Sequence, residues 1–286
     1  MKKRWLILIL LVPFALTARA SQKDSVYIDS IRNIEYQLEG LSYNIINSPD
    51  LNERITSCFY FIQTLKKALL VPTSFDYEFK SLKTVSVVKP NDESFRIFTW
   101  NLLLDSGRYM YFGAMQMNES DSLILYGLYD SSDRLKDPLF STVDHKNWVG
   151  CLYYQIHGYK HKRQKYYLLF GWDGEDEKTN KKVIDVLWFD ENGKPQFGAP
   201  VFEVNEDFQH RMVFEFAERA VMLCRYEEQA NQIVYAHLVP TNPILKGDYA
   251  HYIPDGTYDF LDFKQGFWVK GEQYFEARKK KRNPRR

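Results

Sequence analysis

The apolar residues near the start of the chain follow a helical period. Between residues 24 and 47 they recur at alternating spacings of four and three, which places them along one side of a helix. A second stripe runs over 51–69, after Ser48-Pro49-Asp50, which offers an N-cap and a proline at the first helical position. Because the connection is short, the pattern predicts an antiparallel helical hairpin within residues 21–72.

After Pro72 the apolar period changes from about 3.6 to two, which is typical of strands. Turn sequences such as Asp105-Ser106-Gly107 separate the strands, and short turns join antiparallel neighbours. We therefore predict a mainly β fold, in which residues 73–275 form an antiparallel meandering sheet domain arranged as a sandwich, a barrel or a propeller-like structure. The predicted strands are 84–88, 95–103, 108–117, 122–129, 148–159, 165–172, 182–189, 196–204, 211–216, 221–227, 232–238, 257–263 and 267–270.

Two of these strands are apolar on both faces. Residues 166–170 read Tyr-Tyr-Leu-Leu-Phe, and 183–189 are apolar apart from Asp185. Such strands are central and covered on both sides. Within 196–204, Gly198 and Pro200 indicate a bulge or an edge rather than a ligand site.

The N-terminus has the layout of a cleavable signal peptide. Four residues with three positive charges precede an apolar run over 5–16, and Ala18-Arg19-Ala20 follows. We expect residues 1–20 to be removed between Ala20 and Ser21, and the protein to be exported. The apolar run is shorter than the roughly twenty residues that a membrane-spanning helix needs, so no transmembrane segment is expected after cleavage.

Charge is unevenly distributed between the body and the C-terminus. Seven of the 38 Lys and Arg residues lie in the last nine positions, and four precede Ser21, which leaves 27 against 37 acids in the body. We expect a disordered basic tail over 276–286 that either contacts an anionic surface or keeps the terminus soluble. An acidic body and export both disfavour nucleic acid as a partner.

The chain has three cysteines, without metal-ligand spacing. Cys151 and Cys224 both fall in predicted strands and could form a disulfide in an oxidising compartment. The reading that we favour is that all three cysteines, including Cys58, are small buried apolar residues.

Two acids are candidates for general acid-base catalysis on a glycan. Asp185 interrupts an apolar strand, and a buried acid has a raised pKa or a specific partner. Glu215 lies in a similar strand, Val213-Phe214-Glu215-Phe216. Glycoside hydrolysis needs two carboxylates that face each other at about 5 to 10 Å, whereas strand alternation alone can place such acids on an exposed face.

A loop after a buried strand supplies the candidates for ligand binding. It reads Trp172-Asp173-Gly174-Glu175-Asp176-Glu177, but it lacks the alternating ligands of a calcium-binding loop, so we predict neither a metal nor a cofactor. Exposed tryptophans can stack on sugars or anchor protein interfaces. Because they lie beside turns, Trp172 and Trp268 are the tryptophans that we expect to be exposed, and Asp173 adds a polar group.

Five segments resemble a family of uncharacterised exported proteins from the Bacteroidetes group, and the similarity spans roughly residues 20–275. The resemblance implies a location in a Gram-negative cell envelope, either in the periplasm or at the outer membrane. It implies no activity and no catalytic residue. The segments are 95–101, 148–154, 171–174, 182–187 and 197–202.

The sequence thus favours an exported, non-catalytic binding or structural component of the cell envelope, which contacts a protein partner or a glycan. No nucleophile elbow, zinc motif or phosphate-binding loop indicates an enzyme. The alternatives are a periplasmic hydrolase that acts on glycans through acids such as Asp185 and Glu215, and a carbohydrate-binding module that uses Trp172 or Trp268.

Overall fold

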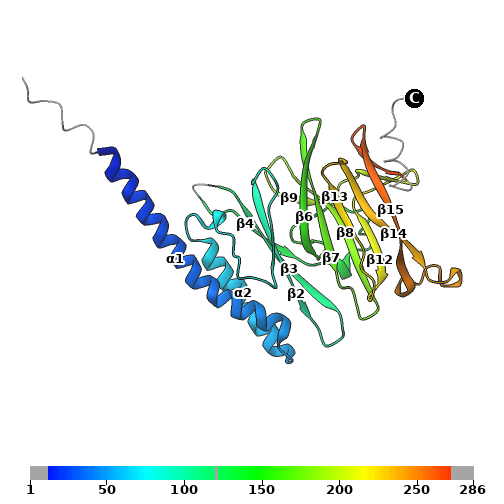
Figure 1. Ribbon diagram of the computed structural model, residues 1–286, viewed down its shortest axis with the longest axis horizontal. Helices are drawn as coiled ribbons and strands as arrows, with labels where there is room; N and C mark the ends of the chain where they lie inside the picture. The colour runs from blue at the N-terminus through cyan, green and yellow to red at the C-terminus, as the bar shows by residue number, and fades with distance from the viewer. Residues whose placement is uncertain (1–11, 120–121, 272–286) are drawn as a thin grey trace, which may run out of the picture. The chain divides into compact units, whose positions relative to one another are not determined.

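The computed structural model describes residues 12–119 and 122–271, with side chains from residue 26 onwards (Figure 1). The chain divides into a helical unit that ends at Lys83 and a β unit that begins at Thr84. The predicted fold class is confirmed: two helices precede a larger region of mainly antiparallel strands. The predicted signal peptide lies partly outside the described residues, as does the whole basic tail.

Two helices form the predicted hairpin. Helix α1 (Val12–Asn47) and helix α2 (Leu51–Leu69) pack through a seam of fully buried apolar side chains. Ile31, Leu38 and Ile45 contribute from α1, and Phe61 and Leu65 from α2. Spacings of seven residues on α1 and of four on α2 place these side chains along one side of each helix.

The helix ends differ from the prediction in two places. Helix α1 already includes Val12, the first described residue, rather than starting near residue 24, and residues 14–23 include three alanines and no glycine to interrupt it. Helix α2 begins two residues later than predicted, because the N-cap is Asp50, whose carboxylate accepts the Asn52 backbone N–H at 2.9 Å. Ser48 instead donates to Glu53 at 2.6 Å.

A buried carboxylate joins the hairpin to the segment after it. Glu35 of α1 is 4% exposed and accepts hydrogen bonds from the Tyr77 hydroxyl and from the Ser81 backbone N–H, the latter at 2.8 Å. Burial and the hydrogen bond to Glu35 raise the pKa of Tyr77 to about 12. These bonds fix the segment that contains a 3₁₀ turn, η1 (Ser74–Asp76), against α1.

The described residues of the β unit form three sheets, of which the first is a four-stranded antiparallel meander. The order of its strands is the order of the chain. They are β1 (Ser86–Val88), β2 (Phe95–Leu103), β3 (Tyr109–Met117) and β4 (Leu125–Tyr129).

The second sheet runs β5-β9-β8-β7-β6, and β12 also pairs with β8. The third sheet runs β11-β10-β16-β15-β14-β13 and contains one parallel pair, β10 with β16. Strands of the second sheet are β5 (Val143–Asp144), β6 (Leu152–His161), β7 (Gln164–Asp173), β8 (Thr179–Phe189), β9 (Pro195–Phe197) and β12 (Met212–Ala217). Strands of the third are β10 (Phe202–Val204), β11 (Asp207–Gln209), β13 (Cys224–Glu227), β14 (Gln232–Pro240), β15 (Tyr252–Lys264) and β16 (Phe267–Gly271).

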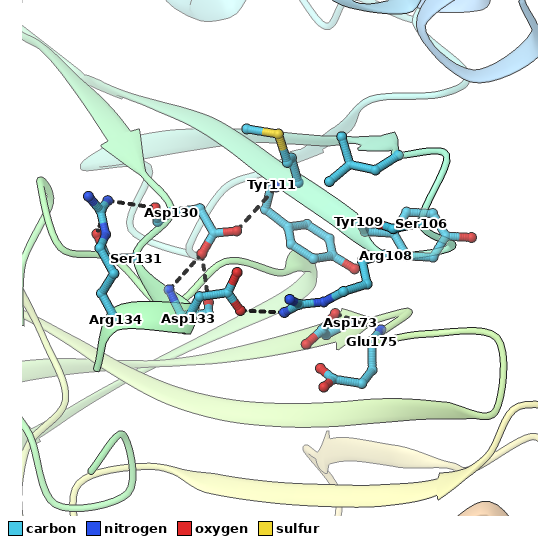
Figure 2. Close-up of a pocket in the computed structure, with 13 residues that line it drawn as sticks. Ser106, Arg108, Tyr109, Tyr111, Asp130, Ser131, Asp133, Arg134, Asp173 and Glu175 are labelled. Carbon is cyan, nitrogen blue, oxygen red and sulfur yellow. Dashed lines mark hydrogen bonds and ion pairs between the residues drawn. The ribbon is translucent and has the colours of Figure 1, made fainter. Parts of the chain in front are cut away.

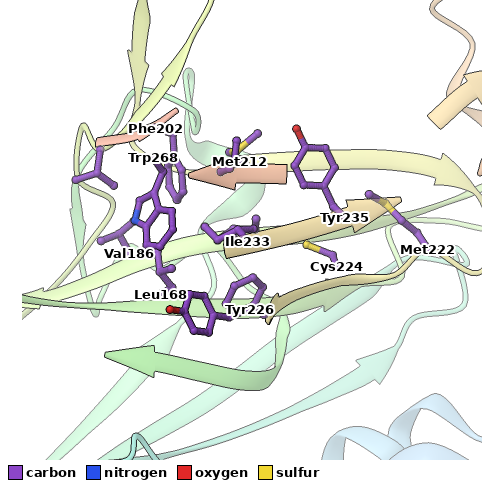
Figure 3. Close-up of a cluster of buried hydrophobic side chains, with 14 of the residues drawn as sticks. Leu168, Val186, Phe202, Met212, Met222, Cys224, Tyr226, Ile233, Tyr235 and Trp268 are labelled. Carbon is purple, nitrogen blue, oxygen red and sulfur yellow. The ribbon is translucent and has the colours of Figure 1, made fainter. Parts of the chain in front are cut away.

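The second sheet is covered on both faces, as the apolar strands predicted. Leu168 and Phe170 of β7 join a core shared with the third sheet, which we call the Phe170 core (Figure 3). Tyr167 and Leu169, one position away, join a core shared with the first sheet, the Leu169 core. Because side chains alternate along a strand, one apolar strand serves two cores.

Two details of the sheets correct the sequence interpretation. Within the described residues no sheet closes into a barrel, so that alternative is excluded. The single predicted strand 196–204 is two strands, β9 and β10, which belong to different sheets. The chain breaks between them because Gly198 has a φ of +88° and a Cβ there would lie 2.5 Å from the Ser141 carbonyl oxygen.

The cysteines are free and buried, as the favoured reading predicted. Cys151 belongs to the Leu169 core and Cys224 to the Phe170 core, so the two thiols lie among the contacts of different faces of the second sheet. In the part of the chain that the structure describes, no helix is both long enough and apolar enough to span a membrane.

Candidate functional site

A pocket of about 430 Å³ opens on the β unit. Three segments far apart in the sequence line it, as Figure 2 shows: residues 104–111 around the β2–β3 turn, residues 130–134 after β4, and residues 173–175 at the end of β7. The β2–β3 turn is tight, because Gly107 has a φ of +79° and donates its N–H to the Leu104 carbonyl at 3.0 Å. The lining is mostly polar, with Tyr109 and Tyr111 as its aromatic members.

Asp130 holds the wall of the pocket together. Its Oδ1 accepts hydrogen bonds from the Ser132 N–H at 3.0 Å, the Ser132 hydroxyl at 2.6 Å and the Gly150 N–H at 3.2 Å. Its Oδ2 faces the Tyr111 N–H at 3.3 Å. A Cβ at Gly150 would lie 2.5 Å from the Asp130 carboxyl carbon, so this approach requires glycine. The Asp130 carboxylate therefore fixes the backbone of this wall of the pocket.

Arg108 and Asp133 form an ion pair across the pocket mouth. Their side chains are 51% and 70% exposed, so water competes for both and the pair can open at low cost. Arg134 also lines the pocket and donates a hydrogen bond to the Ser131 hydroxyl at 3.1 Å. Both guanidinium groups present planar donor arrays that can bind oxygen atoms of a ligand.

Asp173 follows the last apolar residues of β7 and projects into the pocket. Its Oδ1 accepts the Glu175 N–H at 2.9 Å, while the Gly174 N–H donates to the Tyr111 hydroxyl oxygen at 2.7 Å. Burial raises the pKa of Asp173 to about 6, although the Glu175 N–H and Tyr111 oppose the shift. Asp173 therefore changes its charge close to neutral pH. Gly174 permits this packing, because a Cβ there would lie 2.5 Å from the Tyr109 ring.

The fourth acid of the pocket, Glu175, forms an ion pair with Lys181 of β8. The pocket lining thus contains four acids and two arginines. Asp133 and Glu175 are held in ion pairs, Asp130 accepts three backbone N–H groups, and Asp173 accepts one. An excess of acids disfavours an anionic ligand and fits a neutral or cationic one.

The two predicted catalytic acids, Asp185 and Glu215, lie outside this pocket. Asp185 is fully buried and pairs with the fully buried Arg211 at 3.2 Å. Its Oδ1 also accepts the Val186 N–H at 2.8 Å. Burial raises the pKa of Asp185, and the Arg211 guanidinium opposes the rise. Asp185 therefore has both a raised pKa and a specific partner, the two properties expected of an acid in an apolar strand.

Glu215 accepts a hydrogen bond from the Thr179 hydroxyl at 2.9 Å. In the β8–β12 register Glu215 faces Lys181, four residues from Asp185 along β8. Four residues span about 13 Å of strand, which is more than the 5 to 10 Å separation of a catalytic carboxylate pair. The structure therefore does not bring Asp185 and Glu215 together as a pair.

The two candidate tryptophans have different environments. Trp172 is partly exposed and packs edge-on against Tyr109 of the pocket, with ring centroids 6.0 Å apart. Trp268 is 1% exposed, so the expectation that its ring is exposed was wrong (Figure 3). Its strand lies between β10 and β15, and the period of two points this ring into the Phe170 core.

Sequence reasoning named Asp173 but missed the rest of the pocket. Arg108, Tyr109 and Asp130 lie more than forty residues from Asp173, and nothing local connects them. One signal was available: residues 130–134 read Asp-Ser-Ser-Asp-Arg directly after a strand, which is as dense in polar groups as 172–177.

Comparisons with known proteins assign no family: no protein-family model and no curated protein matches the chain. The described residues also contain no group of three or more His, Cys, Asp or Glu side chains placed to hold a metal ion.

Proposed function

We propose that this chain is an exported binding protein of the cell envelope, and that its pocket takes a neutral, polyhydroxylated ligand of the glycan class without chemical conversion. The observation that carries the proposal is the state of the four pocket acids. Asp130 accepts three backbone N–H groups, Asp133 and Glu175 form ion pairs with Arg108 and Lys181, and Asp173 accepts the Glu175 N–H, so no two of the four carboxylates lack a partner. Hydrolysis by paired carboxylates needs two acids that are free to act, whereas binding needs only a fixed polar surface.

The lining suits sugar hydroxyl groups, which donate and accept hydrogen bonds at once. Carboxylates accept, the guanidinium groups of Arg108 and Arg134 donate, and Ser106 does both. The ring of Tyr109 offers an apolar face of the kind that stacks on a sugar ring, and Trp172 supports it from the side. The volume lies within the range of small-molecule sites, about 300 to 1,000 Å³.

Binding can be tested with a printed array of neutral, amino and acidic glycans, followed by titration calorimetry with each glycan that binds. We expect a neutral glycan to bind, and Tyr109→Ala and Asp173→Asn each to weaken binding at least tenfold. Glu191→Gln is the matched control, because it removes one charge at an exposed turn away from the pocket. Failure of every glycan to bind, or equal affinity for the pocket variants and the control, would contradict the proposal.

One observation favours a second function, a hydrolase that acts on glycans. A carboxyl group with a pKa of about 6 can act as a general acid near neutral pH, and Asp173 has that property. The same glycans, incubated with the protein and assayed for new reducing ends, separate the two functions. Cleavage that Asp173→Asn abolishes would replace the binding proposal with the hydrolase.

Export and the basic tail complete the proposal. The basic n-region, the apolar run and Ala18-Arg19-Ala20 support cleavage before Ser21, and the resemblance to exported Bacteroidetes proteins supports an envelope location. Mass spectrometry of the N-terminus, after fractionation of cells, tests this step. Capture of cross-linked envelope proteins by the full chain and by a chain that ends at Ala277 tests whether residues 278–286, the charged part of the tail, contact an anionic partner or surface.

A further inference from the structure

Tyr111 contacts each of the three segments that line the pocket. It belongs to the first of them, residues 104–111, and its backbone N–H is donated to Asp130 in the second at 3.3 Å. Its hydroxyl oxygen accepts the Gly174 N–H of the third segment at 2.7 Å. In Figure 2 its side chain reaches from the side of Asp130 towards Asp173. This one residue therefore links the three walls of the pocket.

The surroundings of Tyr111 fix its ring. Strand β4 pairs with β3 only as far as Phe112, which lies opposite Tyr129, so the Tyr111 N–H needs another acceptor and finds the Asp130 carboxylate. The side chain is 4% exposed and belongs to the Leu169 core. Close packing holds such a ring in one rotamer, so its hydroxyl oxygen has a fixed place in the pocket.

The number of donors and acceptors decides where the Tyr111 proton goes. The hydroxyl oxygen accepts the Gly174 N–H, and the hydroxyl also forms a hydrogen bond with the Asp173 carboxylate. An ionised carboxylate can only accept, so the hydroxyl is the donor in this second bond. Burial raises the pKa of Tyr111 above its usual value, and the negative charge of Asp173 adds to the rise. The hydroxyl therefore keeps its proton and remains a donor.

Charged groups also act on Asp173 from the other elements around it. Glu175 raises its pKa, and Lys181, which lies opposite it in the β7–β8 register, lowers it. Asp173 in turn raises the pKa of Arg108 and of the buried Cys151 thiol, which stays neutral. Burial is the largest influence on Asp173, and it acts against the ionised form. Two further acids line the pocket and have partners of their own, Asp130 and Asp133.

We propose that Tyr111 controls the binding of ligands in the pocket: by donating to Asp173 it favours the ionised carboxylate against burial and holds it in place as an acceptor for a ligand hydroxyl group. Tyr111 is thus a positioning residue that acts through Asp173. A carboxylate accepts a stronger hydrogen bond than a neutral carboxyl group does, so binding should strengthen as the pH rises through the pKa of Asp173, about 6. The inference rests on the proposed function for its ligand, whereas the hydrogen bond belongs to the free protein and can be tested without one.

An NMR titration of the free protein tests the hydrogen bond. With ¹³C in the carboxyl groups of aspartate, the Asp173 signal is the one that Asp173→Asn removes. It should titrate with a midpoint of about 6, and in Tyr111→Phe the midpoint should rise by about one pH unit, because a donor to the ionised form is lost. Tyr109→Phe is the matched control: it removes a hydroxyl from the other tyrosine of the pocket, and the midpoint should keep its parent value. An unchanged midpoint in Tyr111→Phe would overturn the proposal.

A second titration covers the case in which Tyr111→Phe does not fold. With ¹³C at the Cζ atoms of tyrosine, the signal of Tyr111 reports on the hydrogen bond of its own hydroxyl. In the parent protein this signal should shift with the same midpoint as Asp173, and in Asp173→Asn that shift should disappear. A Tyr111 signal that does not respond when Asp173 titrates would also overturn the proposal.

The consequence for binding is tested with a glycan that the array identifies. In Tyr111→Phe the ionised fraction of Asp173 at pH 6.5 should fall from about three quarters to about one quarter, so the affinity should fall about threefold, and by less at pH 8. A loss of the same size at every pH would make the role of Tyr111 purely structural and overturn the proposal. If no glycan binds, the proposed function fails, while the two NMR titrations still decide whether Tyr111 favours the ionised form of Asp173.

Discussion

Asp173 and Asp185 lie on neighbouring strands of one sheet, and burial raises the pKa of both, yet their surroundings differ. Asp185 is fully buried beside Arg211, whereas Asp173 lies at a strand end and lines the pocket. An acid in an apolar strand therefore indicates that its carboxyl group has a specific role. Its position along the strand decides whether that role is in the core or at a ligand site. In the middle of the strand the acid becomes part of the core, and at the end it becomes available to a ligand.

The largest effect should come from the sealed acid. Asp185→Ala leaves the Arg211 guanidinium buried without its carboxylate, so we expect the free energy of unfolding to fall by roughly 3 to 5 kcal/mol in urea titrations. Replacing the pair with Leu and Met should recover part of that loss. A single variant that costs less than about 1 kcal/mol would show that the pair is dispensable.

Asp173→Asn should instead raise the free energy of unfolding at neutral pH. Because the folded protein raises the pKa from 3.8 to about 6, it binds the proton more tightly than the unfolded chain does. The contribution of Asp173 to the free energy of unfolding is therefore greatest below pH 4. It decreases as the pH rises to about 6 and stays low above that pH. Asparagine removes that decrease, so the variant should be more stable than the parent at pH 7.5 by roughly 2 to 3 kcal/mol. Urea titrations between pH 4 and 8 measure this, and parallel curves would contradict it.

Glu35 tests a third type of buried acid, one whose partners are neutral donors. Glu35→Ala leaves the Ser81 N–H and the Tyr77 hydroxyl without their acceptor, so we expect a loss of about 1 to 3 kcal/mol. Glu39→Ala, one turn later on the exposed side of α1, is the control and should change little. Both variants are measured by thermal unfolding. Equal effects of the two substitutions would show that the buried hydrogen bonds of Glu35 add no stability.

The smallest effect on stability should come from Arg108→Gln at the pocket mouth. Its ion pair with Asp133 is exposed, so the free energy of unfolding should change by less than about 1 kcal/mol. The affinity for a glycan that the array identifies should nevertheless fall. A large loss of stability together with unchanged affinity would show that Arg108 is structural.

Most elements could be predicted from the sequence, because their periods depend on local burial. The seam of Ile31, Leu38 and Ile45 and the double-faced strand β7 are examples. The pairing of β10 with β16 could not be predicted, since it is parallel and joins two strands that have five others between them in the sequence. For the same reason Asp173 could be named as a candidate while Arg108, Tyr109 and Asp130 could not: only the order of strands in space brings them together.

The place of β16 also sets an order of events during synthesis. β10 and β11 pair with each other and, through β10, with β16, whose Trp268 donates its backbone N–H to the Val201 carbonyl at 2.7 Å. Until residues near 267–271 have left the ribosome, β10 presents an open edge and the Phe170 core lacks its largest ring. The third sheet can therefore be completed only after β16 has been synthesised. Nascent chains that stall before β16 are the form most exposed to aggregation and to chaperones.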